Sequence, residues 1–448
     1  MQDVYAAVAS SVSVKTFMAL TATKDLECYQ FDFKTAFLNA WIPSGTDYYV
    51  EQPHGLEKSI GKVCKLQKAL YGLRRSPLYW FRAIMPTLKD LGFEPFNSDP
   101  CLFKHKKDGI YIILYVDDLL ISAPTVDDIN KIRDKLRNKY KLKEMGEVKR
   151  FLGFDVIRDR KAKTIFLSQE AYTRNLLEKF EYVDVTESQT PWPSNFELPT
   201  IWEPLVHETK AYIKKTGSLN WLSMGTRPDI TYTVSRLCEA NSGPSESHLT
   251  LLKHLFRYLK RTASLGIQFG GSDLTENDLR LRTYADASHA DHLLTRHSTG
   301  GHVVFLAGGP VLWKSKRQTF VTLSSTEAEF TNLTPAALST QWVAQILREA
   351  GCQQPTPMLL FTDSANARAN VLNPLNTAST RCIDIRYKWI IENVQGGMFQ
   401  LDHLAGNEMV ADGLTKPLQK EKHKRFVRLL GLVSKTVPWN KAKDWGQR

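Results

Sequence analysis

The chain has 448 residues, 42% hydrophobic and 24% charged, which is typical of a globular protein with roughly two to four domains. Lys and Arg outnumber Asp and Glu by 59 to 47, and this net charge of +12 favours a polyanionic partner such as nucleic acid. The six cysteines are widely spaced without a metal-binding pattern, which argues against zinc sites and a disulfide framework. No apolar run reaches the ~18–20 residues of a membrane span, which argues against a membrane protein.

The first third of the chain is predicted to mix short strands with helices. Residues 26–33 and 109–116 are rich in β-branched and aromatic side chains, as strands are. Residues 127–140 have apolar positions every three or four residues and predict a helix. A proline-rich segment at 190–204 then predicts a break without a helix.

The middle of the chain is predicted to be helical. Residues 217–240 and 246–262 have helical character, and the second segment is strongly amphipathic with leucines on one face and basic residues on the other. A second break is predicted at 270–280.

The last part has a new α/β pattern. Strands are predicted at 279–288 and 358–364, and the pattern between them runs through residues 300–315 and a long helix at 325–351. A basic amphipathic helix is predicted at 418–432, and its charges are typical of a solvated face.

Two adjacent carboxylates interrupt the apolar segment "GIYIILYVDDLLIS". Asp117 and Asp118 fit the tight turn of a hairpin, where aspartate is common for structural reasons alone. The predicted strand at 26–33 also carries an aspartate near its end, Asp32. If these segments converge, divalent cations would offset the repulsion, and two Mg²⁺ ions ~3.5–4 Å apart can promote phosphoryl transfer.

A second acidic set lies in the last α/β unit. Asp286 and Asp363 close predicted strands, Glu329 lies in the long predicted helix, and Asp412 lies near a helix start. Four acids at one point suit two-metal hydrolysis of an RNA strand, although each acid alone is more typical of a cap or a surface group. Glu327 competes with Glu329, since the two are about 200° apart on a helix and cannot share a face.

Several motifs together resemble the polymerase of copia-type LTR retrotransposons. "FDFKTAFLN", "VCKLQKALYGLRRSPLYWF" and "LYVDDLLIS" are similar to the reverse transcriptase of that family. "STGGHVVFLAGGPVLWKSKRQTFVTLSSTEAEF" and "VADGLTKPL" are similar to its RNase H. The resemblance covers nearly the whole chain in the family's order, with departures at "ASHADHLLTRHSTGG" and at Cys382, where a histidine is common.

The resemblance implies an α/β and α+β fold. The implied fold consists of a reverse transcriptase palm and thumb, a connection, and an RNase H-like mixed sheet of five strands with flanking helices. The expected domains are the palm at 1–190, thumb and connection helices at 191–280, the RNase H-like domain at 281–417 and a basic tail at 418–448. The family's fingers segment normally precedes the first palm aspartate, so we expect the fingers to be largely missing and the chain to be N-terminally truncated.

The resemblance also assigns roles to individual residues. The implied catalytic and metal-binding residues are Asp32, Asp117 and Asp118 in the palm, with Asp118 contributing less, and Asp286, Glu329, Asp363 and Asp412 in the RNase H-like domain. The implied nucleotide- and template-binding residues are Phe37, Tyr71, Gly72 and Arg74. Phe37 would act as a gate against the ribose 2′-hydroxyl or would be a core aromatic, and Arg74 would line the pocket or contact phosphates nonspecifically. His403 would help products leave or would be a surface histidine.

The implied activity is that of an RNA-directed DNA polymerase, a nucleotidyltransferase, combined with the ribonuclease H endonuclease that degrades the RNA of RNA–DNA hybrids. Each site would use two Mg²⁺ ions, with Mn²⁺ as a substitute. Expected partners are an RNA template, a DNA primer strand, RNA–DNA hybrid, deoxynucleoside triphosphates and a gag particle. We expect a cytoplasmic virus-like particle with access to the nucleus. The alternative is a truncated remnant that retains only RNase H hydrolysis or only nucleic-acid binding.

Overall fold

The computed structural model describes residues 7–55, 61–107, 109–272, 274, 280–373 and 385–436. Cys382 and most of the predicted break at 270–280 lie outside these residues. Backbone contacts divide the chain into two compact units. Unit 1 comprises Met1–Phe17, Lys24–Val148 and Arg348–Cys352, and unit 2 comprises Met18–Thr23, Lys149–Leu347 and Gln353–Arg448. The domain boundaries expected at 190, 280 and 417 stay predictions.

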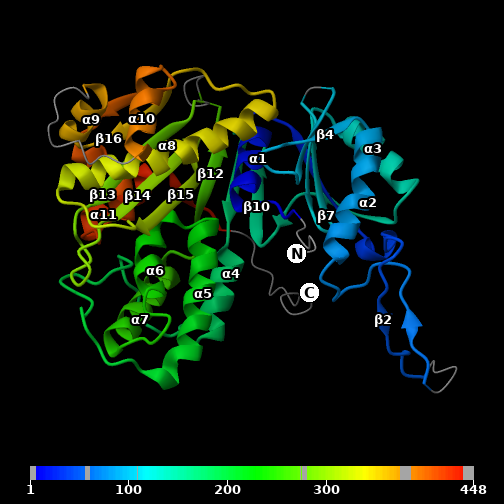
Figure 1. The fold of residues 1–448 in the computed structure, drawn as a ribbon, viewed down its shortest axis with the longest axis horizontal. Helices are drawn as coiled ribbons and strands as arrows, with labels where there is room; N and C mark the ends of the chain where they lie inside the picture. The colour runs from blue at the N-terminus through cyan, green and yellow to red at the C-terminus, as the bar shows by residue number, and fades with distance from the viewer. Residues whose placement is uncertain are drawn as a thin grey trace. The chain divides into compact units, whose positions relative to one another are not determined.

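Unit 1 is built on a six-stranded antiparallel sheet with the order β4-β5-β6-β7-β1-β8. Its strands are β1 (Glu27–Phe33), β4 (Phe93–Pro95), β5 (Leu102–His105), β6 (Tyr111–Tyr115), β7 (Asp118–Ala123) and β8 (Leu142–Glu147). The helices α2 (Ser76–Asp90) and α3 (Val126–Arg137) cover one face of this sheet (Figure 1).

Local sequence signals explain these elements. The strands predicted at 26–33 and 109–116 are confirmed as β1 and β6, and the helix predicted at 127–140 is confirmed as α3. Thr125 caps α3, because its side chain accepts a hydrogen bond from the Asp128 amide. The apolar positions of α3 are buried against the sheet together with Trp80, Ile84 and Leu88 of α2.

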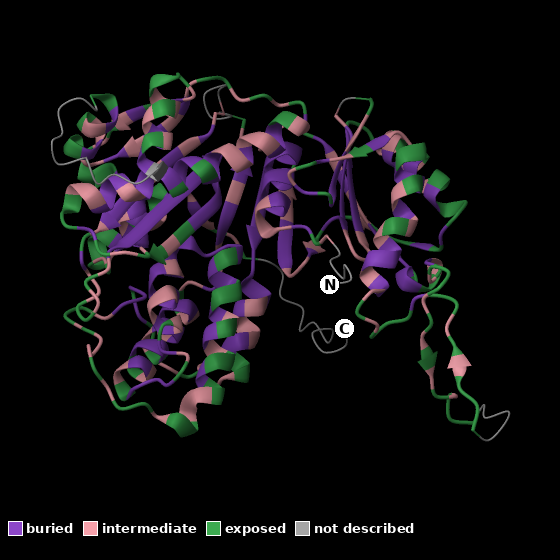
Figure 2. Ribbon diagram, in the orientation of Figure 1, coloured by how far each residue is buried: buried purple, intermediate pink, exposed green. Residues whose placement is uncertain are grey.

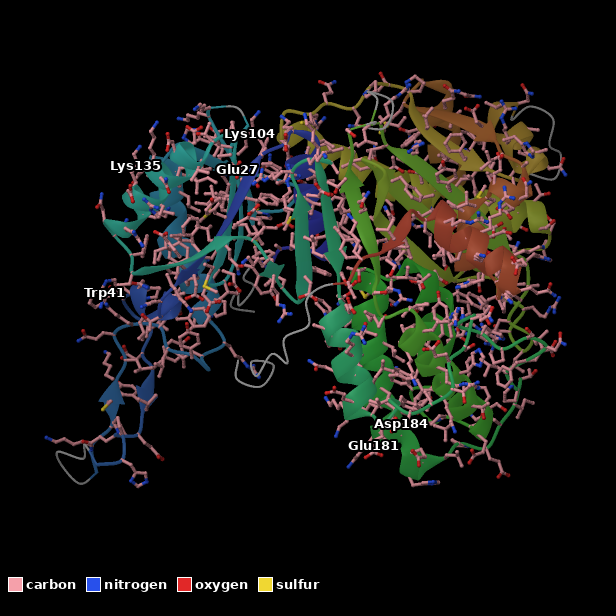
Figure 3. All side chains as sticks on the ribbon, turned by 180° about the vertical axis from the view of Figure 1, so that it is seen from behind. Glu27, Trp41, Lys104, Lys135, Glu181 and Asp184 are labelled. Atoms are coloured by element: carbon pink, nitrogen blue, oxygen red, sulfur yellow. The ribbon has the colours of Figure 1, made fainter. Side chains whose placement is uncertain are left out.

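A two-stranded ribbon, β2 (Tyr49–Val50) and β3 (Cys64–Lys65), follows the short helix η1 (Ala36–Asn39) in unit 1. Its residues are largely exposed, in contrast to the buried strands of the large sheet (Figure 2). Trp41, labelled in Figure 3, is 65% exposed, and the Lys68 ammonium lies 5.0 Å from its ring centroid. The helix α1 (Ser11–Thr23) precedes β1.

Unit 2 contains an antiparallel sheet with the order β18-β12-β11-β10-β9. Its strands are β9 (Arg150–Phe151), β10 (Phe154–Asp159), β11 (Thr164–Ser168), β12 (Leu265–Gly270) and β18 (Leu432–Ser434). The helices α4 (Glu170–Lys179), α5 (Thr209–Gly225), α6 (Thr231–Cys238) and α7 (Glu246–Arg261) supply a common apolar core.

The helical expectations for this region hold with one correction. Residues 190–204 contain no helix, as predicted, and α7 is confirmed with a capping box in which Ser245 and His248 bond reciprocally. The expectation of helix throughout 217–240 is wrong at its centre: α5 ends at Gly225 and the turn η3 (Pro228–Ile230) intervenes before α6. Pro228 lacks an amide proton and cannot continue a helix, which explains the interruption.

The remaining sheet of unit 2 has the order β15-β14-β13-β16-β17. Its strands are β13 (Arg282–Ser288), β14 (Thr299–Leu306), β15 (Gly309–Arg317), β16 (Met358–Thr362) and β17 (Phe399–His403). The first three are paired antiparallel, whereas β16 and β17 run parallel to β13. The helices of this region are α8 (Ser325–Glu349), α9 (Ala365–Leu372) and α10 (Ile385–Gln395). Because β13 and β16 are parallel, their carboxyl ends meet at the same edge of the sheet.

The segment after residue 417 is structured where it is described. The predicted amphipathic helix is confirmed as α11 (Lys420–Leu429), and β18 then pairs with β12. His423 of α11 is buried, and its Nε2 lies 2.9 Å from the hydroxyl of Tyr258 in α7. That hydroxyl donates to Asp229, which also pairs with Arg227 at 2.7 Å. None of the helices in the described part of the chain combines the length and apolar character that crossing a bilayer requires.

Candidate active sites

The first candidate site lies at the β6–β7 hairpin of unit 1. Tyr115 pairs with Asp118, so Val116 and Asp117 form a two-residue turn. Val116 has a φ of +56°, which is costly for a β-branched residue. The indole of Trp80 donates a hydrogen bond of 2.6 Å to the Val116 carbonyl and thereby ties the turn to α2. The expectation that both aspartates occupy the turn is confirmed for Asp117 and wrong for Asp118, which pairs with Tyr115 and begins the returning strand.

The neighbouring strand brings the third predicted acid to the same place. Asp32 of β1 lies directly opposite Asp118 in the antiparallel register. The Phe33 amide donates to the Asp117 carbonyl at 2.8 Å, and the Gln30 side chain donates to Asp118 Oδ1 at 3.3 Å. All three aspartates are half-buried. The fold therefore presents these carboxylates at adjacent strand ends with access to solvent.

The predicted nucleotide-binding residues follow in the chain. Phe37 is buried in η1, and its ring lies 4.5 Å from that of the exposed Tyr71. Gly72 has a φ of +98°, and a Cβ there would meet open space, so the backbone conformation rather than crowding favours glycine. Arg74 is exposed. Phe37 and Tyr71 are thus in contact, and Phe37 belongs to the core at the same time.

The second candidate site lies at the β13–β16 edge in unit 2. Carboxylate oxygens of Asp286, Glu329 and Asp363 all lie within 4.8 Å of one another. Asp286 is on β13 and only 2% exposed, Glu329 is on α8 and 8% exposed, and Asp363 follows β16. Asp412 lies in the short helix η8 (Val410–Leu414) and interacts electrostatically with Asp286 and Asp363.

Burial and crowding disfavour the ionised forms of these acids. Burial, with the charge of Asp286, raises the pKa of Glu329 to about 10. Burial and Asp412 raise the pKa of Asp363, and burial and Asp286 raise the pKa of Asp412. Lys416 Nζ lies 2.8 Å from Asp412 Oδ1 and offsets part of the negative charge.

The donor set of this second site suits a hard divalent cation. Glu329 Oε2 is buried and has no hydrogen-bond partner among the described residues, which leaves a ligand atom without a protein partner. Mg²⁺ prefers carboxylate oxygens. In the described part of the chain, Asp32, Asp117 and Asp118 do not form such a compact group.

The structure distinguishes the two competing glutamates by position. Glu327 Oε2 accepts a hydrogen bond of 2.6 Å from the Leu323 amide, so this side chain caps the start of α8. Glu329 instead joins the acidic group. His403 is exposed, and its ring nitrogen Nε2 lies 3.1 Å from the Asp363 carbonyl.

Three neighbours of the acidic group were missed by the sequence reasoning. Thr415 donates to Asp286 Oδ2, and Lys416 pairs with Asp412. Asn332, one turn after Glu329 on α8, donates to the carbonyls of Asp286 and Gly301 at 2.8 and 2.7 Å. The (i, i+3) spacing of Asn332 from Glu329 and the (i, i+4) spacing of Lys416 from Asp412 could have indicated two of these neighbours, whereas Thr415 had no such signal.

Comparison with known proteins shows the class to which the chain belongs. The model of the reverse transcriptase (RNA-dependent DNA polymerase) family matches residues 1–193. The chain is 33% identical over 443 residues to the retrovirus-related Pol polyprotein from transposon TNT 1-94 of Nicotiana tabacum, and 31% identical over 435 residues to that from transposon RE1 of Arabidopsis thaliana. In both cases the alignment covers 96% of this chain.

A shorter relative is matched along almost its whole length. A transposon Ty5-1 protein of Saccharomyces cerevisiae is 34% identical over 304 residues, which are 67% of this chain and 96% of that protein. The chain therefore belongs to the family of copia-type retrotransposon Pol polyproteins, in their reverse transcriptase region. It spans about a third of the length of the tobacco and Arabidopsis relatives, at 33% and 29%.

Proposed function

We propose that unit 1 is the catalytic palm of an RNA-directed DNA polymerase that copies RNA into DNA. The observation that carries this proposal is the register of the sheet, in which Asp32 faces Asp118 and the Asp117 turn lies next to both. Membership in a reverse transcriptase family supports the same activity. In this proposal α5, α6 and α7 belong to the thumb and connection.

Each residue of this site has a role that follows from its position. Asp32 and Asp117 would hold two Mg²⁺ ions, with a smaller contribution from Asp118. The bound metals would lower the pKa of the attacking 3′-hydroxyl and stabilise the leaving oxygen. Phe37 would exclude the ribose 2′-hydroxyl, backed by its contact with Tyr71. The exposed Arg74 would contact phosphates of the nucleotide or template, beside Gly72.

Primer extension on an RNA template tests this proposal. In Asp117→Asn, one metal-binding carboxylate becomes a neutral amide of the same shape, so we expect extension to fall by about 100- to 1,000-fold. Asp127→Asn is the matched control, because Asp127 is an exposed acid in the first turn of α3. Full extension by Asp117→Asn would contradict the polymerase assignment.

We propose a second activity, RNase H hydrolysis, for the acidic group of unit 2. The close approach of the carboxylates of Asp286, Glu329 and Asp363 carries this proposal. The five-stranded sheet with β13 at its centre would be the RNase H-like domain. Two Mg²⁺ ions, or Mn²⁺ in their place, would activate water and stabilise the departing oxygen.

The surrounding side chains would position the acids of this second site. Asn332 and Thr415 hold the backbone and carboxylate of Asp286, and Lys416 holds Asp412. His403, anchored on the Asp363 carbonyl, would assist the departure of the cleaved strand.

Cleavage of the RNA strand of an RNA–DNA hybrid tests this activity. We expect Glu329→Gln to reduce cleavage by about 100- to 1,000-fold, because a charged ligand is replaced by a neutral amide. Glu327→Gln is the matched control on the same helix and should retain cleavage, since Glu327 caps the helix start. Cleavage that survives Glu329→Gln but not Glu327→Gln would reverse the assignment of the two glutamates.

The proposed partners are RNA template, DNA primer, RNA–DNA hybrid and deoxynucleoside triphosphates, with a gag particle in the cytoplasm and access to the nucleus as the proposed setting. The two activities can also separate. A chain that cleaves hybrids but extends no primer would retain hydrolysis alone. Hybrid binding with a steep salt dependence and neither activity would identify a nucleic-acid-binding remnant.

A further inference from the structure

Asp412 differs from the other acids of unit 2 in the element that carries it. Asp286 lies on the paired strand β13, Asp363 directly follows β16, and Glu329 lies on the 25-residue helix α8. Asp412 lies on η8, a short helix of only five residues. Such a short helix has little stability of its own, so its place depends on the elements that pack against it.

Two glycines show how closely η8 approaches the sheet and α11. A Cβ added at Gly301 of β14 would lie 2.8 Å from the Cβ of Leu414. A Cβ added at Gly413 would lie 2.4 Å from ring carbons of Phe426 in α11. Neither glycine leaves room for a larger residue, so η8 is clamped between β14 and α11. Asp412 is the residue directly before Gly413 and is therefore held by the same contacts.

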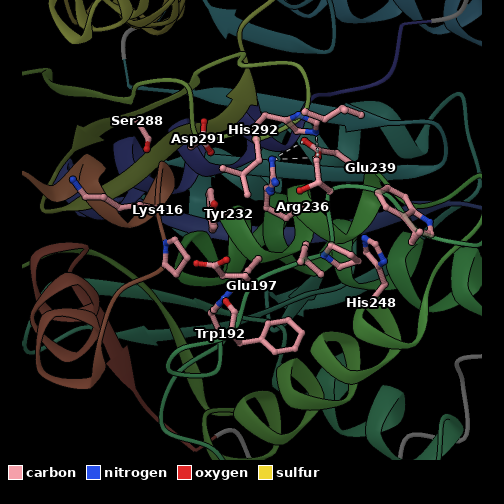
Figure 4. A pocket seen from close by; sticks show the side chains of 18 residues that line it. Trp192, Glu197, Tyr232, Arg236, Glu239, His248, Ser288, Asp291, His292 and Lys416 are labelled. Carbon is pink, nitrogen blue, oxygen red and sulfur yellow. Dashed lines mark hydrogen bonds and ion pairs between the residues drawn. The ribbon is translucent and has the colours of Figure 1, made fainter.

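The chain that follows η8 borders open space. Lys416 lines a pocket of about 240 Å³ together with Ser288 of β13 and Tyr232 of α6 (Figure 4). The Lys416 side chain is 43% exposed, although it pairs with Asp412 at 2.8 Å. This part of the chain is not enclosed by protein, so we attribute the position of η8 to its contacts with the sheet and with α11.

Buried hydrogen bonds orient α11 itself. His423, one turn before Phe426, has its Nε2 2.9 Å from the Tyr258 hydroxyl. That hydroxyl donates its proton to Asp229 at 2.7 Å, so the His423 Nε2–H donates to the hydroxyl oxygen. Asp229 also pairs with Arg227, and all four residues of this network are at most 4% exposed. A buried ion pair adds little net stability, so we attribute to the network the direction in which α11 docks.

We propose that α11 is the positioning element of the second acidic site. Phe426 presses η8 onto the sheet, His423 sets the orientation of α11, and together they bring Asp412 within reach of the cation at the acidic group. The inference rests on the proposed hydrolytic function, because it assumes a divalent cation there. Phe426 and His423 act through the backbone of η8 and are therefore positioning residues.

Mn²⁺ binding tests the proposal by a double-mutant cycle between Phe426 and Asp412. Affinity is measured from the electron paramagnetic resonance of free Mn²⁺, in an Asp117→Asn background that should weaken binding at the palm acids. We expect Phe426→Leu, which opens a gap beside Gly413, to lower the affinity about tenfold, as changes behind metal ligands do. Asp412→Asn should lower it by at least as much, and both changes together should lower it no further.

A second pair of variants tests the hydrogen bond of His423. His423→Leu keeps an apolar side chain in the buried position but removes the donor, and it should lower the Mn²⁺ affinity severalfold. His423→Gln can donate to the same hydroxyl and should retain the parent affinity. Arg425→Gln removes an exposed charge of α11 and is the matched control. Urea unfolding in EDTA checks that each variant is folded.

Three results would overturn the proposal. Parent affinity in Phe426→Leu would show that α11 does not position Asp412. Additive losses in the double variant would show that Phe426 acts independently of Asp412. If Phe426→Leu does not fold, the His423 pair decides, and parent affinity in His423→Leu would be the third. Failure of the hydrolytic function is a separate result, because the coupled loss of Mn²⁺ affinity would persist although the parent chain cleaves no hybrid.

Discussion

The two acidic sites of this chain differ in how far the protein alone assembles them. In unit 1, Asp32, Asp117 and Asp118 stand half-buried at adjacent strand ends and do not form a compact group in the described structure. In unit 2, Asp286, Glu329 and Asp363 are gathered within 4.8 Å. An open site leaves room for a nucleotide and a primer to bring phosphate oxygens to the metals. In a closed site the crowded carboxylates repel one another, and a bound metal ion would relieve this repulsion.

The largest expected effect is that a substitution in one acidic site abolishes one activity and spares the other. Asp32→Asn should reduce primer extension by about 100- to 1,000-fold and leave hybrid cleavage within twofold, and Asp363→Asn should do the reverse. Both activities are measured on one preparation of each variant. If either variant lost both activities equally, the two sites would act as one and the comparison would fail.

The next prediction concerns the free energy of unfolding, because the buried carboxylates of unit 2 repel one another in the folded chain. The folded pKa of Glu329 is about 10, above its ordinary value of 4.5, so its contribution to stability is full below pH 4.5 and is lost as the pH rises towards 10. At pH 7 without metal, Glu329→Gln should therefore stabilise unit 2 by about 3 kcal/mol, measured by urea unfolding in EDTA. An unchanged free energy of unfolding in Glu329→Gln would contradict this prediction.

In EDTA the Glu329→Gln variant is expected to be more stable than the parent chain, and Mg²⁺ should reverse this order of stability. It should stabilise the parent chain against urea, because the metal binds the ionised carboxylates of the folded state only. The Glu329→Gln variant should gain less than the parent. An equal gain in both would mean that Mg²⁺ does not bind through Glu329.

A histidine in the sheet of unit 2 that contains β13 is also buried, and burial shifts its pKa. His302 on β14 lies 2.9 Å from the Ser339 hydroxyl, and burial lowers its pKa to about 3. The unfolded chain takes up this proton below pH 6.5 and the folded chain does not, so stability falls as the pH drops from 6.5 towards 3. At pH 5 the loss should be about 2 kcal/mol. His302→Gln should flatten the pH dependence of the unfolding free energy between pH 6.5 and pH 3, and an unchanged pH dependence would contradict this prediction.

The smallest effect probes how the open site is held. Trp80→Phe removes the hydrogen bond to the Val116 carbonyl at the β6–β7 turn. The loss should cost about 1 kcal/mol and reduce primer extension severalfold, with hybrid cleavage unchanged. Unchanged extension would show that the turn keeps its conformation without α2.

Local signals in the sequence determined much of the secondary structure. The alternation in 26–33, the apolar run in 109–116 and the spacing of Ile129, Ile132 and Leu136 each depend on a few consecutive residues, and they predicted β1, β6 and α3 correctly. The placement of Asp117 in a turn followed from the same local chemistry. The interruption at Pro228 was missed, although proline itself was the signal for it.

Tertiary structure decided which acids meet and what surrounds them. No local pattern could reveal that Thr415 donates a hydrogen bond to Asp286, because these two residues come together only through contacts between distant segments. The same holds for the return of β18 to β12. By itself, the sequence determined the acids and the elements that carry them, because periodicity and turn chemistry are local. Only the packed fold decided that one acidic site is open and the other closed, because burial depends on the whole of each unit.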